Sequence, residues 1–226
     1  PVMQWGQWSL ASMQRALHGA PEPILNSLKF ASLATVTGVA FAVLVSYLTI
    51  KKRSAFTQVL DYIVVLPLTI SGTVLGIALV QTFNTGWLVL AGTSGIMVLC
   101  YAVRRLPFAV RNASSVLFNI PDSIEEASIS LGVSPLMTFF KVILPAMKAS
   151  ILSAAILMWL TTISELSASI VAYSGGLETM PIAIFRQVDG GRLGMASAYG
   201  AALVTVIVLP IIVSVKAFRI KLFSGK

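Results

Sequence analysis

The most regularly spaced polar and helix-breaking residues of this chain lie in one stretch, EEASISLGVSPLMTFFKVILP, at residues 125–145. It begins with two adjacent carboxylates, Glu125 and Glu126, but the sequence offers no nucleophile–base pair to accompany them. His18 is the single histidine, Cys100 is the single cysteine, and neither H-E-x-x-H nor a G-x-x-x-x-G-K-[ST] phosphate loop occurs. We therefore predict no catalytic residue, no metal site and no bound cofactor, and the spacing indicates local structure instead.

The stretch encodes two short helices joined by a turn. Ser123 and Glu126 have the three-residue spacing of a capping box, which would begin the first helix. Gly132 is the residue type that ends a helix in the left-handed conformation, and Ser134-Pro135 supplies an N-cap and a first-turn proline for the second helix. Pro145 is expected to end that second helix. The predicted product is a helix–turn–helix, called the finger below (residues 125–145).

The elements that must hold this finger are membrane helices. The chain is 57% hydrophobic and 11% charged, with a mean hydropathy of +0.89, whereas soluble domains have about a quarter of their residues charged. Several apolar runs approach the roughly 20 residues that cross about 30 Å of hydrocarbon as a helix. The fold class predicted is an all-α integral membrane protein. Its net charge of +8 lies at the ends of the apolar runs, so it indicates topology and not a nucleic-acid partner.

We predict about five spans, at residues 28–50, 58–82, 87–103, 149–173 and 194–215. Asn26 or Ser27 would cap the first, and Pro67 and Gly72 would kink the second, which is then expected to line a pathway. Residues 26–220 form the membrane domain in this scheme. Residues 1–25, which include Trp5 and Trp8, form an outer interfacial segment.

The basic residues orient these spans. Twelve of the 16 Lys and Arg residues fall on one side in this scheme, including Lys51–Arg53, Arg104 and Arg105, which are expected to close the first and third spans. Basic residues are enriched on the cytoplasmic side of membrane proteins. Residues 104–147 are therefore expected inside, and the N-terminus and residues 174–193 outside.

The finger resembles a known motif. Permease subunits of binding-protein-dependent ABC importers carry E-A-A, three residues, G, nine residues and I-x-L-P, and this chain has Glu126-Ala127-Ser128, Gly132 and Val142-Ile143-Leu144-Pro145 at that spacing. Ser128 and Val142 are small departures from it. Residues 60–76, 104–135 and 164–185 are further similar to the branch of ferric-iron and 2-aminoethylphosphonate permeases.

The resemblance implies a type I importer permease, in which the finger docks on cytoplasmic ATPase subunits that bind ATP and Mg²⁺. The residues it implies for that contact are Glu125, Glu126, Ala127, Ser128, Gly132, Ser134, Pro135, Leu144 and Pro145. Further implied partners are a second permease unit, a periplasmic binding protein and the lipid of a bacterial inner membrane. The chain is expected to be the second, C-terminal unit of a longer, fused two-unit permease. Ferric iron is the first expected solute, followed by a phosphonate or a phosphorylated sugar.

Other charged residues leave two interpretations open. Glu165 is the single acid in the fourth span, and it is either a structural acid bonded to Ser164, Ser167 or a neighbouring helix, or a gating and pathway residue. In the outer loop, Arg186, Asp189 and Arg192 are candidates for docking the binding protein, or charges that only keep the loop in solvent. Residues 179–188 there could form a short helix.

Two function classes besides an importer permease remain open from the sequence. Half of a secondary transporter would need coupling-ion ligands near the membrane midplane, and few acids are available there. An intramembrane enzyme would need a buried nucleophile or metal set, which the sequence does not offer.

Overall fold

The computed structural model describes residues 10–223, and the side chains of residues 10–212. Trp5 and Trp8, assigned above to the membrane interface, lie outside these residues. The described elements are all helical: α1 (Ala11–Gln14), a π-helical turn (Arg15–Gly19), α2 (Glu22–Lys51), α3 (Ala55–Thr69), α4 (Gly72–Thr82), α5 (Ser94–Phe118), α6 (Asp122–Ser130), α7 (Pro135–Thr138), a second π-helical turn (Phe139–Ile143), α8 (Leu144–Ala146), α9 (Lys148–Ile163), α10 (Ser169–Ala172), α11 (Met180–Asp189) and α12 (Leu193–Phe223).

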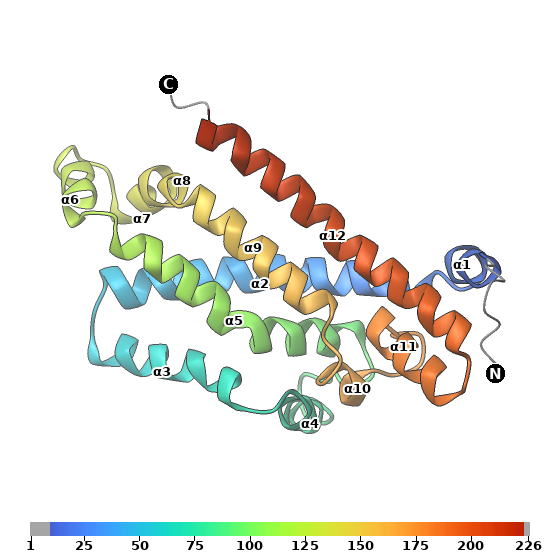
Figure 1. Cartoon of the computed structure of the whole chain (residues 1–226). Coiled ribbons are helices and arrows are strands. Elements are labelled where there is room, and N and C mark those ends of the chain that lie inside the picture. Colours follow the sequence, from blue (N-terminus) through green and yellow to red (C-terminus); the bar gives the residue numbers. More distant parts are fainter. Residues whose placement is uncertain (1–9, 224–226) are drawn as a thin grey trace.

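Three helices, α2, α5 and α9, pack against one another and form the centre of the molecule (Figure 1). The chain places α3 beside α5 on one side, while α12 lies on the outside and is much less buried than α2. At one end of α2 lie α6 and α7, and at the other end lie α1, α10 and α11. α2 therefore runs the length of the molecule and links its two polar ends.

Small residues on α2 explain the close central packing. Ala31, Ala34, Gly38 and Ala42 recur at three- and four-residue intervals on one face and are buried. A Cβ atom added at Gly38 would collide with the side chain of Met158 on α9. Small residues let membrane helices approach closely, so dispersion contacts hold them where lipid supplies no hydrophobic driving force.

By length and composition, α2 and the Leu193–Ile212 part of α12 could each cross a membrane, and the described residues give up to four such spans if each bent pair counts as one. α3 and α4 form one such pair, bent by 115°, and Pro135–Ala146 with α9 forms the other, bent by 70°. The kink predicted in the second span is therefore a complete break at Ile70 and Ser71. The fourth span is interrupted as well, because α9 ends at Ile163.

The third predicted span, residues 87–103, does not end as a helix at Arg104 and Arg105, so its predicted helix boundary was wrong. Both lie in the middle of α5, which continues to Phe118 with Pro107 inside it. The sequence interpretation treated two adjacent arginines as a membrane boundary, but here an acid from another segment pairs with them. By length and composition α5 does not count among the helices that could cross a membrane. It contains Arg111 in addition to Arg104 and Arg105.

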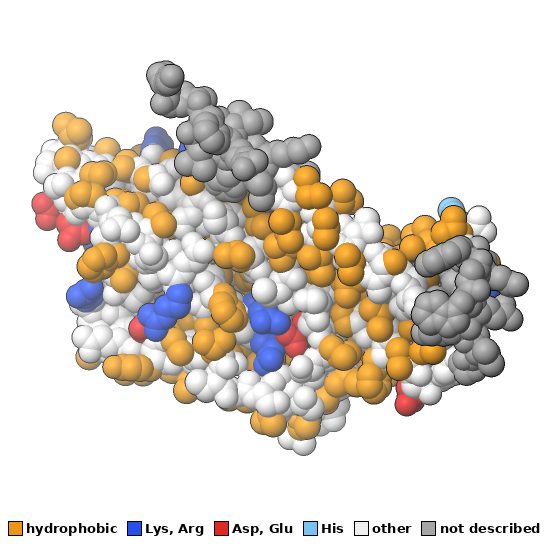
Figure 2. Space-filling model, in the orientation of Figure 1, with side chains coloured by type: hydrophobic (Ala, Val, Ile, Leu, Met, Phe, Trp, Pro, Cys, Tyr) orange, Lys and Arg blue, Asp and Glu red, His pale blue; other side chains and the backbone are white. Residues whose placement is uncertain are grey.

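The outer surface is strongly apolar. Large hydrophobic side chains on α2 and α3, such as Val36, Phe41 and Tyr62, are half exposed or more. Figure 2 shows hydrophobic side chains spread over the face drawn, with basic side chains beside acidic ones at separate places. This is the surface expected of a protein whose solvent is lipid with local polar sites.

Candidate functional site

The finger contains two short helices, α6 and α7, joined by a turn. α6 ends in a Schellman motif, in which the Gly132 amide donates to the Ile129 carbonyl (2.9 Å) and the Val133 amide donates to the Ser128 carbonyl (3.2 Å). Gly132 has φ +84°, the left-handed conformation that disfavours other residues. Ser134 is the N-cap of α7 and accepts a hydrogen bond from the Met137 amide at 3.4 Å, with Pro135 in the first turn.

Two details of the finger differ from the prediction. Pro121 and not Ser123 precedes the first helical residue of α6, and no side chain caps that end, so the Ser123–Glu126 capping box does not form. Pro145 does not end the second helix either. It sits in the first turn of α8, and the bend into α9 falls at Met147.

The two glutamates of the finger have different environments. Glu125 is buried, and its Oε1 accepts hydrogen bonds from the Tyr47 hydroxyl (2.8 Å) and the Lys52 ammonium (3.0 Å). Glu126 is exposed. Glu125 therefore fixes α6 to the end of α2, whereas Glu126 is free to contact a partner.

A second polar tie joins the same elements. The Lys51 ammonium donates to the Ile120 carbonyl and to the Asp122 carboxylate, both at 2.6 Å. This hydrogen bond and the Lys51 charge lower the pKa of Asp122 below its ordinary range, so the pair is present at neutral pH and is lost only on strong acidification. The C-terminal end of α2 thus holds the start of α6 at two points.

The base of the finger is packed, and its tip is bare. The rings of Tyr47 and Phe139 lie 4.7 Å apart, and Ile143 and Met147 are fully buried in the core formed by α2, α5 and α9. Ser128 and Thr138 are hydrogen-bonded at 2.9 Å between α6 and α7. At the tip, Leu131 is 85% exposed and Leu136 is 71% exposed. Ala127 is exposed and Leu144 half-buried, so the implied contact residues divide between tip and base.

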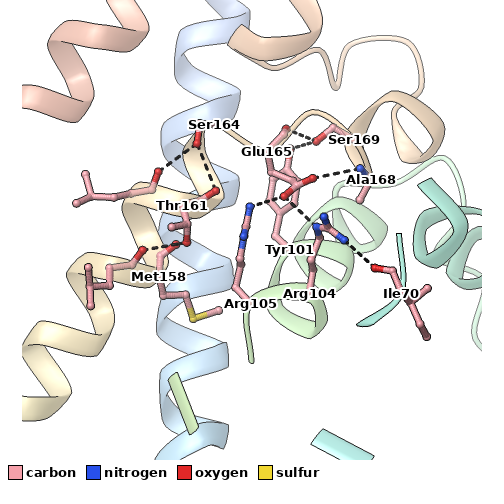
Figure 3. A network of polar contacts seen from close by, with 12 residues as sticks. Ile70, Tyr101, Arg104, Arg105, Met158, Thr161, Ser164, Glu165, Ala168 and Ser169 are labelled. Atoms are coloured by element: carbon pink, nitrogen blue, oxygen red, sulfur yellow. Dashed lines mark hydrogen bonds and ion pairs between the residues drawn. The ribbon is translucent and has the colours of Figure 1, made fainter. Parts of the chain in front are cut away.

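A second candidate site surrounds Glu165 (Figure 3). The carboxylate is 4% exposed and lies between α9 and α10, and its Oε2 accepts from Arg104 Nε (3.1 Å) and from an Arg105 terminal nitrogen (2.5 Å). Its Oε1 lies 3.4 Å from the Ala168 amide. The partner is therefore a neighbouring helix, one of the sequence alternatives. Ser164 donates instead to carbonyls of its own helix, and no hydrogen bond joins Ser167 to Glu165 within the described part of the chain.

This cluster joins the two broken helices through α5. Arg104 donates to the Ile70 carbonyl at 3.3 Å, at the break between α3 and α4. A Cβ atom added at Gly72 would lie 2.7 Å from the Arg104 guanidinium carbon and 2.8 Å from Ser167 Cβ. Gly72 is thus brought into the cluster, while Pro67 lies inside α3, outside the contacts around Glu165. The helical break frees the Ile70 carbonyl, which the arginine satisfies.

The outer loop contains the predicted short helix, α11. Asn26 and Ser27 do not cap α2, whose N-cap is Pro21; they bind the loop instead. Asn26 donates to the Gly176 and Glu178 carbonyls (2.9 and 3.0 Å), and Ser27 accepts from the Met180 amide at 2.7 Å. Arg186 pairs with Glu178 at 3.3 Å.

The remaining docking candidates are free on the surface of this loop. Asp189 ends α11 and Arg192 follows it, and both are exposed. The structure therefore brings Arg186, Asp189 and Arg192 to one exposed segment, but does not by itself give them a partner.

Sequence reasoning missed the residues that support these sites. Tyr47, Lys51 and Lys52 hold the finger, and Arg104 and Arg105 hold Glu165. The sequence did contain a signal for the Glu165 pairing: one apolar segment has a lone acid, and another has two adjacent arginines. Buried charges need partners, so these residues could have been expected to pair.

The finger and the outer loop are separated by the length of α2. Ser27 contacts the loop and Lys51 contacts α6, and 24 residues of helix between them span about 36 Å. This exceeds the roughly 30 Å of a hydrocarbon core. If α2 crosses a membrane, the two sites lie on opposite sides of it.

Comparison with known proteins gives consistent results. Residues 34–220 match the family model described as binding-protein-dependent transport system inner membrane component. The ferric transport system permease protein FbpB of Actinobacillus pleuropneumoniae is 28% identical over 83% of this chain and 27% of its own length. A putative 2-aminoethylphosphonate transport system permease protein, PhnV, of Salmonella choleraesuis is 30% identical over 97% of this chain and 82% of its own length.

Solved structures give the same fold. An alginate-importing bacterial ABC transporter chain has a TM-score of 0.74 at 16% identity, covering 99% of this chain and 86% of its own length. A chain of the MetNI methionine transporter has a TM-score of 0.71 at 19% identity, covering 94% of this chain and 98% of its own length. The fold is thus that of type I importer permeases, and the branch matches the resemblance noted in the sequence. This chain spans about a quarter of the ferric permease relatives it matches.

The matched family model covers most of the chain, including the finger, the Glu165 cluster and α11. The chain therefore belongs to the family of inner-membrane components of binding-protein-dependent transport systems.

Proposed function

We propose that this chain is one permease unit of an ATP-driven importer, in which the finger docks on a cytoplasmic ATPase and transmits its closure to the membrane helices. The observation that carries this proposal is the finger itself, fixed at its base and apolar at its exposed tip. Leu131 and Leu136 are among the most exposed large apolar residues of the described chain, and exposed apolar groups of this kind mark interaction surfaces.

The contacts of the finger provide a route for mechanical coupling. Glu125 and Asp122 tie α6 to the last turn of α2, and Ile143 and Met147 insert into the same core as Met158 of α9. A displacement of the finger would therefore move α2 and α9 with it, because a close-packed core does not deform continuously. At the far end, α2 is tied to the loop before α11 through Asn26 and Ser27.

The same proposal assigns the remaining partners. A periplasmic binding protein would dock near Arg186, Asp189 and Arg192, a second permease unit would complete the pathway, and ATP with Mg²⁺ would bind the ATPase and not this chain. The inner membrane of a bacterium is the implied location, with residues 119–146 on the cytoplasmic side. Ferric iron is the first solute we propose, since relatives are named for ferric transport, and a phosphonate or phosphorylated sugar is next.

The test is coupling between three purified proteins. The permease with its ATPase should be reconstituted in liposomes, and ATP hydrolysis measured with and without loaded binding protein. We expect stimulation that is lost when Leu131 and Leu136 are both changed to Ser. Leu10→Ser, at an equally exposed leucine near the other end of the molecule, is the matched control.

The outcomes separate the alternatives. Uptake that follows an ion gradient without ATP would favour half of a secondary transporter, and would contradict the proposal. Loss of stimulation in the Leu10→Ser control as well would show that exposed leucines act on stability and not on docking.

A further inference from the structure

The cluster around Glu165 carries more positive charge than it neutralises. Two guanidinium groups, from Arg104 and Arg105, share one oxygen of one carboxylate, which leaves one net positive charge. The two side chains are 21% and 20% exposed, so the cluster is reachable from outside the protein while its acid is not. In Figure 3 both arginines extend from α5 toward the same carboxylate.

The arginines also have unused hydrogen-bond donors. A guanidinium offers five N–H groups, and those of Arg105 make one hydrogen bond, through a terminal nitrogen to Glu165, in the described chain. Arg105 Nε is buried and has no hydrogen-bond partner among the described residues. Such a donor is costly unless something accepts from it. Paired guanidinium groups with free donors match the oxygens of phosphates, phosphonates and carboxylates.

A second arrangement of the same kind lies further along α5. Arg111, seven residues after Arg104, is on the same helical face and about 10 Å away along the axis. It pairs with Asp61 of α3 at 3.2 Å. Arg111, Asp61 and Arg53 line one cavity of about 260 Å³, so this site too has two arginines for one acid.

We propose that this face of α5 is an anion path, with Arg104 and Arg105 as its first contact and Arg111 and Arg53 as its second. This inference rests on the proposed function and restricts its substrate class: the solute crosses as an oxyanion or as an anionic ferric chelate, and not as a bare metal cation. Fixed positive charge in a low-dielectric environment attracts anions and repels cations, and it does so more strongly than in water.

The first test is protection from chemical modification and needs no transport. The purified permease–ATPase complex should be treated with phenylglyoxal, which modifies arginine, in sodium chloride or in sodium phosphate of equal ionic strength. Mass spectrometry of the peptides would report each arginine. We expect modification of Arg104 and Arg105 to be at least threefold slower in phosphate, while exposed Arg192 is unchanged. Equal rates at all three residues would overturn the proposal.

The second test uses the sign of the charge change. Arg105→Gln removes a positive charge and should weaken phosphate protection of Arg104, whereas Glu165→Gln adds net positive charge and should strengthen it by a few-fold. If the cluster has only a structural role, phosphate protection of Arg104 should be lost in both variants. That result would refute the anion path. Lys29→Gln, an exposed basic residue on α2, is the control for net charge.

Replacing phosphate by ferric citrate, 2-aminoethylphosphonate or neutral maltose in the protection assay distinguishes the sources of the anion. Protection by either anion supports an anionic substrate class, and protection by neutral maltose contradicts it. Binding-protein-stimulated ATP hydrolysis is measured on the same preparation. Stimulation without protection would reject only the anion path, whereas protection without stimulation would reject the importer function proposed above.

Discussion

At the scale of single residues, the two adjacent glutamates of the finger have different roles. Glu125 faces inward and bonds Tyr47 and Lys52, while Glu126 faces solvent. Their one-residue offset on a helix turns them about 100° apart, so both cannot face α2. The buried glutamate secures the finger, and the exposed one is available to the ATPase that we propose as a partner.

Glu125→Ala should lower the stability of the purified permease by about 2 kcal/mol, because Tyr47 loses its buried charged partner. The Lys52 pair adds little to this figure, since the lysine side chain is 51% exposed. Glu126→Ala is the matched control and should leave the midpoint of thermal unfolding within experimental error. Equal destabilisation by the two changes would contradict the division of roles.

Gly132→Val should leave the permease inserted in the membrane but abolish co-purification of its ATPase. A residue with a Cβ costs about 1–2 kcal/mol in the left-handed conformation, and a β-branched residue is disfavoured further. Gly132→Asn is the control, since asparagine tolerates that conformation. Membrane abundance by immunoblot and ATPase recovered by affinity purification give the two readouts, and an intact complex in the valine variant would disprove the coupling role.

At the scale of helices, α5 supports the interruptions in its neighbours. Arg104 reaches the break between α3 and α4, and both arginines reach the break between α9 and α10. Breaks in membrane helices leave backbone groups unpaired. At the α3–α4 break Arg104 satisfies the Ile70 carbonyl, and at the α9–α10 break both arginines pair with the Glu165 carboxylate. The broken helices and the charged α5 therefore depend on one another.

Gly72→Ala should disturb this support. The added Cβ would meet Arg104 and Ser167 at under 3 Å, so Arg104 must shift away from the Ile70 carbonyl. We expect a loss of about 1–3 kcal/mol, the usual cost of overpacking, together with reduced uptake. Gly175→Ala is the control, because nothing lies within 4 Å of a Cβ at that glycine. Wild-type thermal stability for Gly72→Ala would rule out the tight contact.

At the outer end, changing both Arg186 and Arg192 to Gln should slow docking of the binding protein at low salt. The Arg186–Glu178 pair is half exposed, so its loss should change stability by no more than about 0.5 kcal/mol. Surface charges act mainly on association rates and their salt dependence. Stopped-flow association at low and high salt would measure this, and an unchanged rate at low salt would remove the two arginines from the docking surface.

At the scale of the whole molecule, the length of α2 sets the distance between the finger and the loop before α11. The loop before α11 is attached to its first turns and the finger to its last turn, about 36 Å apart. Ten basic residues remain on the inner side of the predicted topology after Arg104 and Arg105 are assigned to the middle of α5, against four outside.

Single cysteines test the resulting orientation. Ser130→Cys and Gly175→Cys are both exposed positions, at the finger and the outer loop. In intact spheroplasts an impermeant thiol reagent should label Gly175→Cys and not Ser130→Cys, with both labelled after lysis. Cys100 is fully buried and should react only after denaturation, which provides an internal control. Labelling of Ser130→Cys alone in spheroplasts would reverse the orientation.

The sequence by itself determined the local features of this protein. Hydrophobic runs predicted a helical membrane protein, and the finger was found from Gly132 and Ser134-Pro135, because a positive φ and an N-cap depend on residues close in the chain. The family resemblance followed from that same spacing and was confirmed over residues 34–220. The sequence rules failed at the start of α6, where the helix begins after Pro121, so Ser123 lies inside the helix and does not cap it.

Only the tertiary structure decided how charges separated by many residues pair. Arg104 and Glu165 are 61 residues apart, and Tyr47 and Glu125 are 78 apart, so no spacing rule connects them. The positive-inside rule assigned the two arginines to a membrane boundary, since it assumes that a charge avoids the bilayer. A buried carboxylate and a free carbonyl from neighbouring helices offset the desolvation of charge in the middle of α5, and only the packing of those helices brings them there.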